Sequence, residues 1–302
     1  MKVVSFYRFL DVNDPQPFRD ELQALCEDHG LLGTILVADE GFNGTLAGNA
    51  AAIRAVLTWL QKRFGIAEDL DARWTDADEP PFRHMRVRIK KEIVALGRPD
   101  LLPHEKTGKH VSPEEWNALI EDPDVLVIDT RNHYEFEVGT FPGALDPGND
   151  SFREFPAFAT ELAKTSNDRP LAMFCTGGIR CEKATALMLE LGFNEVYHLQ
   201  GGILNYLEVT PADENRWQGE CFVFDTRVAV DRDLAEGGYV QCHACRRPLS
   251  KEDLASPDYR EGVSCPRCVN EADEDRIARL EERRRQIRLA RQRGESHIGA
   301  NT

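Results

Sequence analysis

The sequence lacks any apolar run long enough to cross a membrane, because such a span needs about 20 consecutive apolar residues. Its opening residues, Met1 to Arg8, resemble a strand interrupted by charge rather than a secretory signal peptide. We therefore expect a cytoplasmic protein with no membrane partner. No sequence feature marks an obligate protein partner either.

The chain also lacks positive charge overall. Its 37 lysines and arginines are outnumbered by 52 aspartates and glutamates, which gives a net charge of −15. An acidic protein has no general field that attracts nucleic acid, so any polyanion must be bound by local basic patches. At 302 residues the chain is long enough for two or three domains, each with its own core.

The eight cysteines are not expected to form a disulfide framework, because the cytoplasm keeps thiols reduced. Their spacing predicts catalysis and metal binding instead. Cys26 falls in a predicted helix and Cys221 in a predicted strand, where both are expected to pack as small apolar residues.

Cys175 lies between a short apolar strand, residues 171–174, and a helical segment that ends at Gly192. Gly177 and Gly178 allow a tight turn with inward-pointing N–H groups, and the positive end of the helix dipole is directed at the same place. A nearby arginine and lysine add positive charge, so the thiolate is favoured over the thiol. We predict that Cys175 is a nucleophile or a persulfide carrier. The alternative is a buried, unreactive cysteine.

Two groups of residues accompany this cysteine. Arg180 and Cys181 are predicted to take part in catalysis, and the substrate is expected to contact Thr176, Gly177, Gly178 and Lys183. For Cys181 two interpretations stay open. It could resolve a persulfide or sulfenate formed on Cys175, or it could begin the helix and pack.

Residues 1–97 alternate strand and helix signals in the order β-α-β-β-α-β, which is typical of a ferredoxin-like α+β domain. The fourth strand is expected within residues 82–96, where Arg86, Arg88 and Lys90 share one face. With the neighbouring Arg83, His84 and Lys91 they make a basic stripe. It is either a solvated sheet face or a track for the phosphates of RNA.

Residues 98–110 contain prolines and a glycine and are expected to form a linker. Ser112, Pro113 and Glu115 then predict a capped helix. The apolar run 125–128 is typical of a buried parallel strand. Because strands and helices alternate from 111 to 212, this region is predicted to be a doubly wound α/β domain with a parallel sheet.

The last two regions have different compositions. In residues 213–270 two C-x2-C pairs predict a structural zinc site with no open position, and its ligands are Cys242, Cys245, Cys265 and Cys268. Unligated, reduced thiols are the alternative. Residues 271–302 form a charged tail with eight arginines against two glutamates between Arg276 and Arg293. The tail is either a solvated helix or an arm that orders on RNA.

Several short motifs of the middle region together resemble a rhodanese domain. They are Asp129-Thr130-Arg131, Glu135-Phe136, Gly139 to Ala144, the loop from Cys175 to Arg180, and Leu199 to Ile203. The resemblance implies that Cys175 carries a persulfide; Thr140 stands where that family usually has histidine. Related phosphatases use a C-x5-R loop, whereas this loop is C-x4-R, which disfavours phosphatase activity. His133 and Glu135 have the H-x-E spacing of iron oxygenases, but no second histidine is marked by spacing.

The whole arrangement, together with Glu40 to Thr45, resembles the bacterial rhodanese-type tRNA uridine hydroxylase family. This resemblance implies an oxidoreductase that uses molecular oxygen to convert the wobble uridine of tRNA, position 34, to 5-hydroxyuridine, with Cys175 as its essential cysteine. Two other functions stay open. One is a rhodanese-type sulfurtransferase, and the other is a zinc-containing RNA-binding scaffold whose rhodanese domain is inert.

Overall fold

The computed structural model describes the whole chain apart from residues 68–69, 71, 78–79 and 295–302. The end of the predicted basic tail therefore lies outside the described residues. The chain divides into two compact units. The first comprises Met1–Phe136 with Phe141–Arg216, and the second comprises Glu137–Thr140 with Trp217–Thr302.

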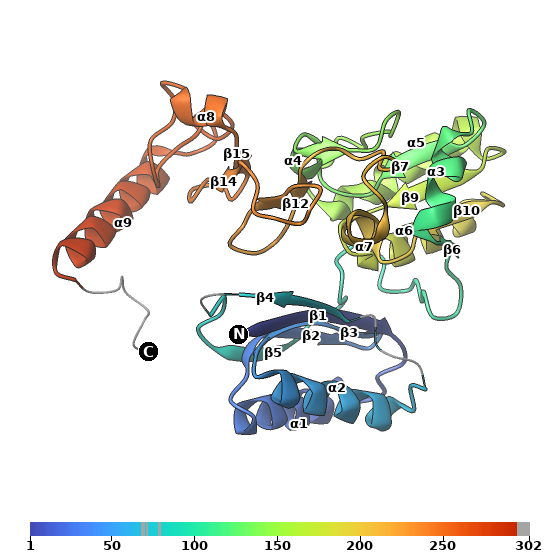
Figure 1. Cartoon of the computed structure of the whole chain (residues 1–302), viewed down its shortest axis with the longest axis horizontal. Coiled ribbons are helices and arrows are strands. Elements are labelled where there is room, and N and C mark those ends of the chain that lie inside the picture. The colour runs from blue at the N-terminus through green and yellow to red at the C-terminus, as the bar shows by residue number, and fades with distance from the viewer. Residues whose placement is uncertain (68–69, 71, 78–79, 295–302) are drawn as a thin grey trace. The chain divides into compact units, whose positions relative to one another are not determined.

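The first unit begins with a five-stranded mixed sheet in the order β4-β1-β3-β2-β5, and two helices lie on one of its faces (Figure 1). Its elements are β1 (Lys2–Phe9), α1 (Pro15–Asp28), β2 (Leu32–Ala38), β3 (Gly41–Gly48), α2 (Ala50–Phe64), β4 (Arg73–Asp76) and β5 (Met85–Ile89). The first four strands pair antiparallel, whereas β5 pairs parallel to β2. This confirms the predicted ferredoxin-like class.

Local sequence explains the helices of this sheet. The side chain of Asn49 accepts a hydrogen bond from the Ala51 N–H and so caps the start of α2, and Gly65 ends the helix with a left-handed φ of 64°. The apolar face of α2 is buried against the sheet at Ile53, Val56 and Leu60. Burial of this face holds the helix in place.

The fourth strand of the ferredoxin-like order lies earlier in the chain than predicted. The strand beside β1 is β4, whereas the segment expected to fill that place supplies β5 at the opposite edge. β4 has only four residues, and its side chains are not fully buried, so it carries little hydrophobic signal.

A parallel sheet in the order β6-β10-β9-β7 completes the first unit and confirms the predicted doubly wound region. Its elements, with the short β8 that clusters with the second unit, are β6 (Lys109–Val111), α3 (Pro113–Glu121), β7 (Leu126–Asp129), α4 (His133–Phe136), β8 (Gly139–Thr140), the 3-10 helix Phe152–Glu154, α5 (Phe155–Ser166), β9 (Leu171–Phe174), α6 (Ile179–Glu190), β10 (Val196–Leu199) and α7 (Gly202–Val209).

Two boundaries of this sheet bear on the sequence predictions. The capping box that begins α3 is formed as expected, with Ser112 accepting from the Glu115 N–H and the Glu115 side chain accepting from the Ser112 N–H. The expected linker, by contrast, ends in strand β6, which pairs with β10 at the sheet edge. Residues 109–110 are therefore part of the sheet.

The second unit consists of short paired strands and two helices. They are β11 (Gln218–Gly219), β12 (Cys221–Phe222), β13 (Ala229–Val230), β14 (Val240–Gln241), β15 (Pro248–Leu249), α8 (Lys251–Ala255) and α9 (Glu274–Gln292). Helix α9 contains no fully buried side chain among those described. Over the residues that the structure covers, we find no helix with the length and apolarity needed to span a bilayer.

Candidate active site and cysteine cluster

Cys175 follows the buried strand β9 and begins the turn into α6. The Gly178 N–H donates to Cys175 Sγ at 3.1 Å. Gly178 has a φ of 94°, a conformation that favours glycine, and it directly precedes the helix. The sulfur is therefore held by a backbone donor at the positive end of a helix, as the sequence predicted.

The loop is hydrogen-bonded to the start of α7. The Ile203 N–H donates to the Cys175 carbonyl at 2.9 Å, and the Leu204 N–H donates to the Thr176 carbonyl at 3.1 Å. Gly202 allows this approach, since a Cβ atom there would lie 2.5 Å from the Cys175 oxygen. Because these carbonyls have partners in α7, the N–H groups of the loop remain directed toward the sulfur.

The Cys175 thiol is a stronger acid than an ordinary cysteine. Burial alone would raise its pKa, but the Cys181 thiol, the Arg180 charge and backbone N–H groups outweigh burial and lower the pKa to about 6. The pKa of Cys181 moves in the opposite direction, well above its usual value, because of burial and the neighbouring Cys175. Near neutral pH, Cys175 is thus a thiolate and Cys181 a neutral hydrogen-bond donor to it.

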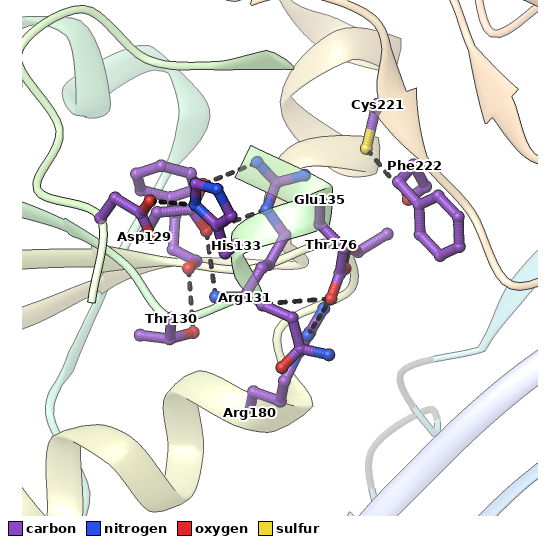
Figure 2. A network of polar contacts seen from close by, with 12 residues as sticks. Asp129, Thr130, Arg131, His133, Glu135, Thr176, Arg180, Cys221 and Phe222 are labelled. Carbon is purple, nitrogen blue, oxygen red and sulfur yellow. Dashed lines mark hydrogen bonds and ion pairs between the residues drawn. The ribbon is translucent and has the colours of Figure 1, made fainter. Parts of the chain in front are cut away.

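Arg180 is held by a carboxylate that the sequence interpretation assigned only to the rhodanese pattern. Its guanidinium donates to both oxygens of Glu135, at 2.7 and 2.8 Å, and to Thr176 Oγ1 at 3.3 Å (Figure 2). Glu135 is fully buried. Burial would raise its pKa, but the charge of Arg180 lowers it, so the carboxylate stays ionised. The pair fixes the arginine beside the loop.

Lys183 has a different environment from the one predicted. Its buried ammonium donates to Glu40 at 2.8 Å and to Glu92 at 2.6 Å. The same Glu92 also accepts from the backbone N–H groups of Leu96, Gly97 and Arg98. This links α6 to the N-terminal sheet through a buried ion triad. The sequence marked one member of this triad, because Glu40 begins the motif Glu40 to Thr45 on which the family resemblance partly rests.

The basic stripe is exposed. Arg83, Arg86, Arg88 and Lys90 all lie at the surface on or beside β5, while Val87 between them is buried. A solvated sheet face and a track for RNA phosphates both require exposed side chains, so the exposure is compatible with either interpretation.

The four predicted metal ligands lie together in the second unit. Their sulfurs are all within 4.8 Å of one another. Cys245 Sγ and Cys265 Sγ are 3.8 Å apart, and Cys265 Sγ and Cys268 Sγ are 3.5 Å apart. Four sulfurs bound to one ion through bonds of ~2.3 Å lie roughly 3.8 Å apart. The core here contains few apolar side chains besides Leu249, so these thiols could hold a metal ion that supports the fold.

Comparison with known families defines the class of protein first. Residues 1–93 match the model of the UPF0176 acylphosphatase like domain, and residues 112–208 match the rhodanese-like domain. Together they cover more than half of the chain. It is therefore a rhodanese protein with an acylphosphatase-like N-terminal domain.

Full-length relatives define the family more narrowly. The chain is 50% identical over 300 residues to the tRNA uridine(34) hydroxylase of Rhizobium leguminosarum bv. trifolii, covering 99% of this chain and 96% of the relative. The tRNA uridine(34) hydroxylase of Agrobacterium fabrum is 49% identical, with 98% and 94% covered. That of Gluconobacter oxydans is also 49% identical, with 99% and 96% covered. The chain belongs to the tRNA uridine(34) hydroxylase family, and the resemblance in its sequence is confirmed.

Proposed function

We propose that this protein hydroxylates uridine 34 of tRNA to 5-hydroxyuridine, with molecular oxygen as co-substrate and Cys175 as the nucleophile. The observation that carries the proposal is the buried Cys175 sulfur, whose pKa is lowered to about 6. The full-length relatives are tRNA uridine(34) hydroxylases, which supports the same reaction.

A thiolate can activate C5 of uracil toward an oxygen donor by adding to C6. Addition of Cys175 Sγ to C6 moves the electron pair of the C5–C6 bond toward C5, so C5 becomes nucleophilic toward an oxygen donor. Loss of the C5 proton and departure of the thiolate then restore the ring. One atom of dioxygen enters C5, and the other leaves as water, which requires two electrons from an external reductant. Alternatively, dioxygen first adds to the sulfur of Cys175, or to the outer sulfur of a persulfide there, and the distal oxygen of this peroxidised sulfur passes to C5. The sulfenate that is left on the sulfur is then reduced by the same two-electron donor.

The loop is suited to this role because its charges are already in place. Arg180 is oriented by two hydrogen bonds from its guanidinium to Glu135, so it supports negative charge on the sulfur without moving. The Cys181 thiol can donate to the sulfur as a leaving thiolate forms. Since the Cys181 thiol is hydrogen-bonded to Cys175, resolution of a persulfide or sulfenate formed there is a second role that we propose for it, and packing at the start of α6 is the alternative that the sequence left open.

Two other features, the basic stripe and the cysteine cluster, fit a tRNA enzyme. The exposed basic stripe offers a local track for phosphates on a chain whose net charge is −15. The four-cysteine cluster would hold a structural zinc ion, because all four positions of a tetrahedral site are filled by protein sulfurs. In this proposal neither the basic stripe nor the cysteine cluster takes part in the chemical step.

The second candidate is a sulfurtransferase that passes a persulfide from Cys175 to an acceptor. The match to a rhodanese-like domain over residues 112–208 favours it. The hydroxylase and the sulfurtransferase both need the Cys175 thiolate, so the Cys175 loop does not distinguish them. Their products do.

The test is nucleoside mass spectrometry of tRNA from cells that lack the protein. We expect 5-hydroxyuridine and its derivatives to disappear and to return with the wild type but not with Cys175→Ala. Cys26→Ala is the matched control, since Cys26 is a buried cysteine in the core of the N-terminal sheet and should restore the modification.

Two results would contradict the proposal. Full restoration by Cys175→Ala would remove the thiolate from the reaction. Unchanged 5-hydroxyuridine together with a loss of thiolated nucleosides would replace the hydroxylase with the sulfurtransferase.

A further inference from the structure

Three metal-ligating side chains meet beside α6, apart from the cysteine cluster. His110 in β6 and His198 in β10 are paired in the parallel register, and their rings lie 4.1 Å apart. His110 Nε2 is 2.9 Å from Oε1 of Glu182, the residue after Cys181 in α6. One donor atom from each of the three residues lies within 4.8 Å of the other two.

His198 presents an unused lone pair. Its Nε2 lies 3.1 Å from the Gly108 carbonyl oxygen, which can only accept, so the neutral ring carries its proton on Nε2. Nδ1 is then a bare acceptor. The residue is only 1% exposed, and Nδ1 has no hydrogen-bond partner within the described part of the chain. A metal-binding histidine commonly donates its other N–H to a backbone carbonyl in this way.

Glu182 is held so that one of its oxygens faces the histidines. The Thr107 hydroxyl donates to Glu182 Oε2 at 3.0 Å, while Oε1 is directed to His110 and receives a longer contact from the Tyr7 hydroxyl at 3.5 Å. The carboxylate is nearly buried, whereas the His110 side chain is 46% exposed. An ion could therefore enter on the His110 side and keep water as a further ligand there.

We propose that His110, Glu182 and His198 form a second metal site, which binds one divalent transition-metal ion. Imidazole nitrogens favour zinc, iron, nickel and copper over magnesium and calcium. Ligand atoms on one such ion, at bond lengths of ~2.1 Å, lie roughly 3–3.5 Å apart, so small side-chain rotations close the cluster.

Ferrous iron is the ion we expect. Two histidines and one carboxylate with open positions are the ligand set of non-haem iron oxygenases. This choice of ion rests on the proposed hydroxylation, whereas metal binding itself does not. The H-x-E spacing of His133 and Glu135, which no second histidine accompanies, is a poor fit by comparison, because both oxygens of Glu135 accept hydrogen bonds from Arg180.

The first test is an anaerobic titration of the full chain with Co²⁺ after one equivalent of zinc per chain has filled the cysteine cluster, with any excess zinc removed. We expect one further ion per chain, with weak ligand-field absorption and no thiolate-to-cobalt charge-transfer band. His198→Ala and His110→Ala should each weaken this binding by more than about 100-fold, since both remove a direct ligand. His133→Ala is the matched control and should bind Co²⁺ as the wild type does.

The proposal is overturned if the zinc-filled wild type takes up no Co²⁺, or if His110→Ala binds it as tightly as the wild type. The half-exposed His110 keeps the test decisive even if His198→Ala misfolds.

The choice of iron is tested by measuring tRNA hydroxylation after loading the second site with Fe²⁺ in place of Co²⁺. Equal modification of tRNA by the wild type and His110→Ala would overturn the choice of iron and leave the metal site standing. Intact Co²⁺ binding with no hydroxylation by any variant would instead contradict the proposed function.

Discussion

The two cysteine sites of this chain stabilise sulfur in different ways. Cys175 is a single thiolate held by the Gly178 N–H, the Cys181 thiol and the charge of Arg180. In the cysteine cluster of the second unit, four sulfurs surround one point. Hydrogen bonds and charge lower the pKa of a thiolate but leave lone pairs free to attack carbon. A closed tetrahedral metal site uses those lone pairs for coordination. We therefore expect a reactive thiolate at Cys175 and metal ligation in the cluster.

The largest expected effect comes from breaking the cluster. Cys242→Ser should prevent tight metal binding there, and binding of a structural zinc ion stabilises small domains by about 10–16 kcal/mol. We expect amides in β14, β15 and α8 to lose protection against hydrogen exchange. Cys221→Ala, a buried cysteine outside the cluster, should keep both the metal and the protection. Unchanged protection after removal of the metal by a chelator would show that the apolar contacts suffice.

A smaller loss is expected when the arginine beside Cys175 loses its partner. Glu135→Gln leaves the Arg180 guanidinium buried beside a neutral amide, and breaking a buried pair lowers the free energy of unfolding by about 3–5 kcal/mol. Urea unfolding measures this change. Glu161→Gln removes the exposed partner of Lys164 and should change stability by less than about 1 kcal/mol. Equal effects of the two variants would mean that Arg180 does not depend on Glu135.

The smallest effect concerns RNA binding. Replacing Arg86 and Arg88 with alanine should weaken tRNA binding and flatten its dependence on salt, by roughly 0.7–0.9 in the logarithmic slope for each phosphate that the protein no longer neutralises. Fluorescence anisotropy at several salt concentrations measures the slope. Lys164→Ala removes an exposed charge from α5 and should leave the slope unchanged. A slope unaffected by removal of both arginines would identify the stripe as a solvated face.

Local patterns in the sequence predicted both cysteine sites. The Gly-Gly pair after Cys175 and the two C-x2-C pairs each place their chemistry within a few residues, so spacing alone defines the geometry. The same holds for the capping box of Ser112 and for the limits of α2.

Contacts between distant segments could not be predicted in this way. Glu40 reaches Lys183 from 143 positions away in the chain, and Glu92 reaches it from 91. The pairing of His110 with His198 depends on β6 joining the sheet edge, in a segment whose prolines and glycine predicted a linker. The sequence predicts β5 as a strand but not its place in the sheet. The position beside β1 is taken by β4, whose side chains are not fully buried, so β5 lies at the opposite edge. Tertiary packing, not local propensity, decides these positions.

The most direct test of the central claim is the titration of the Cys175 thiolate. The ultraviolet absorbance of thiolates is followed against pH in the wild type and in Cys175→Ser, and the difference isolates this sulfur. Because the pKa is lowered, the thiolate should form as pH rises through about 6 and should predominate at neutral pH. Hydroxylation of tRNA should rise over the same range, and Cys181→Ala should move both curves to higher pH. A midpoint near the usual cysteine value of 9.0 would contradict the account.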